Sequence, residues 1–239
     1  MDAHLPQRAH LGRLTMTLSP LREFALKALL WLPLSFVIWF VLAPLLVWPV
    51  GVAARAVLLA LWPELFSGLV QGAQVVDHAG QVLGSSGYLF ELTTKILVRA
   101  DDGGRVGLGV LETTLNPMIY GYALPLFSGL TLATPASIRR RAGQIAVAFA
   151  AIWLAQTFGV VAESLKVVAF QAGAPGQAAA EKAGLQPNVI ALAYQFGYLI
   201  LPALVPVALW VGFNRSFIES LVGQGREPDP GNQSHSHVE

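Results

Sequence analysis

Four long apolar stretches, separated by polar or glycine-rich segments, dominate the hydrophobic pattern of this chain. The first, residues 24–50, carries no charge from Ala28 to its end, which is about the length an α-helix needs to cross roughly 30 Å of hydrocarbon. The other three cover residues 116–136, 143–170 and 188–213. The pattern predicts a mainly α-helical, polytopic membrane protein with about four transmembrane helices.

The first stretch differs from a cleaved signal peptide. The apolar region of a signal peptide is about 7–15 residues long and ends at small residues, whereas this one is longer and ends in Trp48-Pro49. We therefore expect it to be retained as a membrane anchor. Pro33 and Pro44 remove backbone donors within it and predict kinks or close packing against protein.

Residues 51–66 are apolar but too short to cross a bilayer, with Arg55 near their start and Pro63-Glu64 near their end. This composition favours an interfacial helix on the outer face of the membrane. A re-entrant segment is the alternative.

Residues 67–115 differ in character, because glycine and charged residues become frequent there. Two β-rich runs flank Asp101-Asp102-Gly103-Gly104, a sequence that is typical of a hairpin turn. Residues 70–76 and 82–88 offer further strands, with a turn at His78-Ala79-Gly80. We expect a small β-containing segment outside the membrane, on the side opposite the cytoplasm.

Basic residues set the expected orientation. Arg22 and Lys27 precede the first span, and Arg139, Arg140 and Arg141 lie in a short loop, residues 137–142, between the second and third. By the positive-inside bias this loop is cytoplasmic, with anionic lipid headgroups as an alternative ligand for its arginines. Both termini are then cytoplasmic and residues 171–187 form an outer loop. The remaining segments are a leader, residues 1–23, and a polar tail, residues 214–239.

Composition agrees with several spans and excludes some chemistry. Hydrophobic residues make up 54% of the 239 residues and charged residues only 12%. The net charge of +1 does not indicate binding to nucleic acid. The chain has no cysteine, which excludes disulfides, thiolate metal sites and a cysteine nucleophile. The histidines are scattered, so neither a metal site nor a cofactor is expected.

Polar residues at membrane depth are the candidates for function, because they are costly to leave unpaired in hydrocarbon. Glu163 and Lys166 share a helix face and can pair, with Gln156 two turns earlier on the same side. A candidate polar cleft, open to the outside, groups residues near the outer ends of the spans: Glu112, Asn116, Tyr120, Glu163, Lys166, Tyr194 and Gln195. The alternatives are an exposed Glu163–Lys166 pair at the interface and a belt of tyrosine anchors.

The sequence also resembles a known family. The run PLREFALKALLWLPLSFVIWFVLAPLLVWPV, then LETTLNPMIYGYALPLFSGLTLATP, the three arginines and AQTFGVVAESLK are similar to exosortase H-associated membrane proteins. A looser similarity extends to exosortases and archaeosortases, which resemble cysteine transpeptidases acting with a membrane-embedded Cys, an Arg and a His or second Arg. Because this chain has no cysteine, that enzymatic resemblance fails at its central residue.

The resemblance implies an accessory role without catalytic residues, in the inner membrane of a Gram-negative bacterium. The expected partners are membrane lipids and either an exosortase-like enzyme or the C-terminal sorting helix of its substrate. Two other classes stay open: a membrane enzyme using Glu163 and Lys166 as an acid–base pair, and a channel or transporter that would have to be oligomeric.

Overall fold

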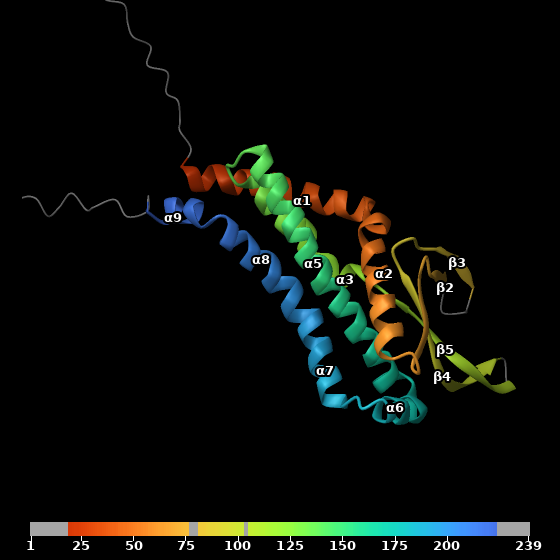
Figure 1. The fold of residues 1–239 in the computed structure, drawn as a ribbon. Helices are drawn as coiled ribbons and strands as arrows, with labels where there is room; N and C mark the ends of the chain where they lie inside the picture. The colour runs from red at the N-terminus through yellow and green to blue at the C-terminus, as the bar shows by residue number, and fades with distance from the viewer. Residues whose placement is uncertain (1–18, 77–80, 103–104, 224–239) are drawn as a thin grey trace, which may run out of the picture.

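A computed structural model describes residues 19–76, 81–102 and 105–223 (Figure 1). Its helices and strands follow one another in the order α1 (Pro20–Val41), α2 (Ala43–Leu61), β1 (Phe66–Gln71), β2 (Gln74–Val76), β3 (Val82–Ser85), β4 (Phe90–Asp102), β5 (Arg105–Leu115), α3 (Met118–Gly121), α4 (Ala123–Ala133), α5 (Ile138–Lys166), η1 (Val167–Gln171), α6 (Gly173–Lys182), α7 (Pro187–Gln195), η2 (Phe196–Ile200), α8 (Leu201–Phe213) and α9 (Arg215–Gly223).

The fold class expected from the sequence is confirmed. Four helical segments are long and apolar enough to cross a membrane: Pro20–Val41, Ala43–Leu61, Ile138–Gln171 and Pro187–Phe213. A shorter apolar helix covers Met118–Ala133. A three-stranded sheet and a two-stranded sheet lie to one side of the helices, so the protein is mainly α-helical with a small β region (Figure 1).

The first apolar stretch differs from the continuous span expected over residues 24–50. Leu42 breaks it into α1 and α2, which meet at an elbow (Figure 1). Pro44 lies in the first turn of α2, where its missing N–H costs no hydrogen bond, whereas in one continuous helix it would disrupt the bonding. The expected separate helix over residues 51–66 is absent from the described chain, because α2 continues through Leu61.

One hydrophobic core joins α4, the first half of α5 and α8. Its buried members are Ala123, Leu124, Phe127, Ala148 and Ile152. Trp39 of α1 and Trp210 of α8 are partly buried and pack against this core. We call this part of the fold the bundle.

A second core joins α2, the sheet and the second half of α5, and we call this part the cap. Val47, Val50 and Leu58 of α2 belong to the same buried cluster as Phe90 of β4 and Val160 of α5. The Phe90 ring lies so close to α2 that a Cβ added at Gly51 would be 3.0 Å from its Cζ. Because α5 contributes to both cores, it ties the cap to the bundle.

The three-stranded sheet has the order β1-β4-β5 and is antiparallel throughout. β4 and β5 form the hairpin expected around residues 101–104, with Asp102 opposite Arg105. Strands β2 and β3 fall within the further β runs expected over residues 70–76 and 82–88, whereas β1 begins earlier, at Phe66, and only its end overlaps the first run. The turn expected at residues 78–80 lies outside the described residues.

The three adjacent arginines lie in a helix and not in the loop expected over residues 137–142. Ser137 accepts a hydrogen bond from the Arg140 backbone N–H and caps α5, which begins at Ile138. A serine at this position favours helix initiation, and the apolar residues that follow carry the helix onward. The loop between α4 and α5 is correspondingly short.

The first and last described helices meet at one end of the molecule. The Phe24 ring of α1 stacks on Trp210 of α8, with centroids 5.7 Å apart, and makes an edge contact with Phe217 of α9 at 5.4 Å. The β4–β5 hairpin and α6 lie at the opposite end (Figure 1). The chain therefore starts and finishes its described path at the same end.

Candidate functional site

The polar residues expected on α5 do share one helix face. Gln156 is fully buried, and its Nε2 donates a hydrogen bond of 2.8 Å to the carbonyl oxygen of Pro117, which precedes α3. Glu163 lies two turns further along α5 and is half-buried. This face of α5 therefore meets α3 along two helical turns.

Tyr120 is the partner of the only acidic side chain on this face. Its hydroxyl donates a hydrogen bond of 2.9 Å to Oε2 of Glu163, and the tyrosine itself is 1% exposed. This hydrogen bond joins two buried or half-buried groups on different helices, so it stabilises the packing of α3 on α5. Tyr120 and Glu163 were both expected in the polar cleft.

Lys166 makes a different contact from the one expected. The side chains of Glu163 and Lys166 are both described, and they do not come within ion-pair distance. Instead Nζ of Lys166 lies 4.4 Å from the centre of the Tyr194 ring on α7, a cation–π geometry. Tyr194 stacks in turn on Tyr198 at 5.7 Å, with an interplanar angle of 4°.

Tyr198 closes the group, because its ring also makes an edge contact with Tyr120 at 6.3 Å. We call Tyr120, Glu163, Lys166, Tyr194 and Tyr198 the polar cluster. It joins α3, α5, α7 and η2 at the junction between the bundle and the cap.

Glycines make this close packing of helices possible. A Cβ added at Gly159 of α5 would lie 2.5 Å from Cδ1 of Tyr120, and one at Gly121 would lie 2.7 Å from Nε2 of Gln156. A Cβ at Gly197 of η2 would lie 3.0 Å from the Cα of Gly159. These glycines hold the Tyr120 ring between α5 and η2, and sequence reasoning missed them because nothing in an apolar helix distinguishes a packing glycine.

Three of the expected cleft residues lie outside this group. Glu112 is exposed on β5, opposite Thr93 of β4. Asn116 is exposed, and its Oδ1 accepts a hydrogen bond from the Met118 backbone N–H, which starts α3. Gln195 is exposed at the end of α7. The cleft expected from the sequence is therefore a compact cluster of fewer residues.

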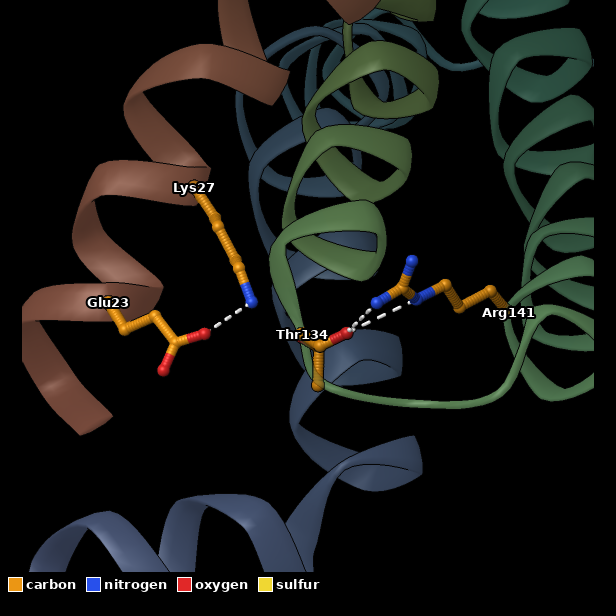
Figure 2. Close-up of polar contacts among 4 residues, drawn as sticks. All are labelled: Glu23, Lys27, Thr134 and Arg141. Atoms are coloured by element: carbon orange, nitrogen blue, oxygen red, sulfur yellow. Dashed lines mark hydrogen bonds and ion pairs between the residues drawn. The ribbon is translucent and has the colours of Figure 1, made fainter.

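The arginines at the start of α5 bind helix ends, as Figure 2 shows for Arg141. Its Nε and Nη2 donate to the Thr134 carbonyl oxygen at 3.2 and 2.8 Å, while Nη2 of Arg140 donates to the Phe213 carbonyl oxygen at 2.8 Å. Both carbonyls lie at C-terminal helix ends, where positive charge is favourable. Lys27 pairs with Glu23 on α1 nearby, with Nζ to Oε1 at 2.6 Å.

The described chain contains no group of three or more His, Asp or Glu side chains placed to hold a metal. The polar cluster supplies one carboxylate, one ammonium group and three phenols. Its carboxylate accepts a hydrogen bond from within the protein, and its ammonium group lies on an aromatic ring. In this arrangement the polar side chains hold helices together. Acid–base chemistry would require the contacts of Glu163 with Tyr120 and of Lys166 with Tyr194 to break.

An apolar groove lies between the elbow of α1 and α2 and the outer side of α4. Its volume is about 170 Å³, and its lining includes Ser35, Trp39, Leu46, Leu124, Ser128 and Phe149. Ser35 of α1 is buried and Ser128 of α4 is half-buried. The groove has the size and apolarity to take a large side chain from a neighbouring helix.

The family described as exosortase H-associated membrane protein matches residues 18–217. No match was found among curated proteins or among solved structures.

Proposed function

The chain belongs to the exosortase H-associated membrane proteins, and from that membership we propose that it is an accessory subunit of an exosortase-type sorting system. In this role it binds the enzyme, or the C-terminal sorting helix of the enzyme's substrate, within the membrane and performs no chemistry itself. The enzyme supplies the catalytic residues.

The internal use of the polar cluster is the observation that carries this proposal. Glu163 accepts a hydrogen bond from Tyr120 and Nζ of Lys166 lies over the Tyr194 ring, so these two ionisable groups hold helices together. A chain without cysteine also cannot supply the thiolate of a cysteine transpeptidase. Both facts favour a binding role over a catalytic one.

The groove beside α4 is the surface we assign to the partner helix. Association of helices in lipid depends on close packing, because lipid tails are as apolar as the side chains that would leave them. The surface of the groove is almost wholly apolar, so it offers a cavity for an apolar side chain of the partner. α1, which forms one wall, is the least buried of the four candidate spans.

We expect Ser128→Phe to fill the groove and to lower recovery of the enzyme with the tagged protein by about tenfold, as for a central contact residue. The measurement is co-purification from native membranes in mild detergent, quantified against the amount of tagged protein. Leu30→Phe is the matched control, because Leu30 is 65% exposed on α1 and does not line the groove. Equal recovery with both variants would contradict the assignment of the groove.

For the orientation we propose the bacterial inner membrane with both termini in the cytoplasm and the cap in the periplasm. Two observations support this. The described chain starts and finishes at the end that carries Arg139, Arg140 and Arg141. The cap contains strands with open edges, which are not tolerated in hydrocarbon, so α2 lies outside the membrane although its length would allow crossing. The shorter apolar helix Met118–Ala133 then supplies the fourth crossing, together with α1, Ile138–Gln171 and Pro187–Phe213, and returns the chain to the cytoplasm.

The absence of cysteine makes this orientation simple to test. Ser85→Cys on β3 and Ser216→Cys on α9 place single thiols at exposed positions of opposite ends. We expect a membrane-impermeant maleimide to label Ser85→Cys in spheroplasts, and Ser216→Cys only after lysis. The reverse pattern would contradict the proposed orientation, and the unsubstituted protein is the control for background labelling.

A further inference from the structure

Strand β5 leaves one edge of the sheet open. β4 pairs along its other edge, and within the described chain no strand pairs with its outer edge. In Figure 1 the far end of the β4–β5 hairpin extends beyond the helices, while Leu97 and Leu108 line a pocket with residues of the segment 171–175. Leu108 is 72% exposed and Val110 is 48% exposed.

On the outer edge of β5, backbone N–H and C=O groups are free to form hydrogen bonds with another strand. The Leu111 carbonyl accepts a hydrogen bond from Thr94 Oγ1, so the peptide groups of Leu111 face β4. Successive residues of a strand direct these groups to opposite sides, and those of Leu108 and Val110 therefore face outward. Soluble folds usually blunt such an edge with charge or proline, yet residues 106–111, VGLGVL, have neither.

The sequence of this edge is also the same in both directions. Residues 106–110 read VGLGV, a palindrome centred on Leu108. Two copies of such a strand, placed antiparallel, oppose identical residue types at every position when Leu108 faces Leu108. A two-fold interface uses the same patch on both subunits, so a self-complementary strand fits a second copy of this chain better than an unrelated peptide.

We propose that this protein forms a homodimer in which β5 of one copy pairs antiparallel with β5 of the other, with the two-fold axis at Leu108. The two three-stranded sheets then form one continuous sheet. Leu97 lies opposite Val110 and on the same face as Leu108, so the pairing gathers these apolar side chains from both copies. The proposal is independent of the accessory role.

Cysteine scanning in the cysteine-free chain tests the register. In the proposed dimer the two Leu108 Cα atoms are about 5.5 Å apart, within the range that a disulfide spans. The two Val110 Cα atoms are four residues out of register, about 14 Å apart, which a disulfide cannot bridge. Leu108→Cys should therefore form a covalent dimer when native membranes are oxidised with copper phenanthroline, whereas Val110→Cys should stay monomeric.

The cross-linking result decides between the outcomes. Cross-linking of both variants would show random collision, cross-linking of Val110→Cys alone would show a different register, and cross-linking of neither would show no pairing. Each of these would overturn the proposal.

A measurement without cross-linking provides a second test. Leu108→Lys places two ammonium groups opposite each other at the axis and should shift the detergent-solubilised protein from dimer to monomer in mass photometry. Leu83→Lys is the matched control, because Leu83 is 69% exposed on β3 and outside the proposed interface. An equal oligomeric state for both variants would also overturn the proposal.

Discussion

Gly159→Ala is expected to destabilise the protein by about 1–3 kcal/mol, the usual cost of inserting a methyl group into a packed core. The new Cβ would lie 2.5 Å from Cδ1 of Tyr120, whose ring has no free space because the tyrosine is fully buried. To admit the methyl group, the ring must move and lengthen the hydrogen bond from Tyr120 to Glu163. Thermal unfolding in detergent, followed by tryptophan fluorescence, measures the effect as a lower Tm.

Gly143→Ala on the same helix provides the matched control. A Cβ at Gly143 meets no atom within 4 Å, and alanine is a better helix former than glycine by about 0.5–1 kcal/mol. We therefore expect this variant to keep or raise the Tm. A Gly159→Ala variant as stable as the Gly143→Ala variant would mean that the Tyr120 ring is not held as the structure shows.

Gly129→Val is expected to separate α1 from α4. A Cβ at Gly129 would lie 2.9 Å from the Cα of Leu32, a backbone atom that can move only with its helix. Small residues allow this close approach of helices, and a branched side chain here acts as a wedge. Because α1 and α4 form the two walls of the groove, we expect loss of enzyme co-purification together with a lower Tm.

Comparison with Gly212→Val isolates this effect from the low helix propensity of valine. Gly212 lies in α8 with no atom within 4 Å of an added Cβ, so this variant carries the same change of side chain without the clash. Limited proteolysis of the two variants should cut near α1 faster in Gly129→Val. Identical digestion and identical recovery of the enzyme would contradict the packing of α1 on α4.

Hydropathy predicted the helical class, and a glycine-rich turn between two β-rich runs predicted the β region, because both signals are local properties of the sequence. The elbow at Leu42 was harder to predict. A proline in an apolar run fits a kinked helix as well as the first turn of a new one, and the choice depends on what packs beside it. Here Gln71 Nε2 donates to the Pro44 carbonyl oxygen at 2.7 Å, a contact between residues distant in sequence.

In the candidate site, too, local sequence predicts some features, whereas others depend on contacts between residues distant in sequence. Spacing along α5 predicts that Gln156, Glu163 and Lys166 share one helix face, since the period of a helix is fixed. Spacing did not identify the partners of Glu163 and Lys166, because these lie on α3 and α7. A tyrosine hydroxyl and an aromatic ring compete with the neighbouring charge for each group, and only the packing of three helices decides between them.

The length of α5 has a consequence for the β4–β5 hairpin. The helical segment Ile138–Gln171 has 34 residues, about 51 Å at 1.5 Å per residue, whereas the hydrocarbon layer is about 30 Å thick. If the first turn of this helix lies at the cytoplasmic surface of the membrane, as proposed above, about 20 Å of the helix extends beyond the opposite surface. In the proposed orientation, the second half of α5 therefore holds the cap, with the β5 edges of two copies, above the membrane surface.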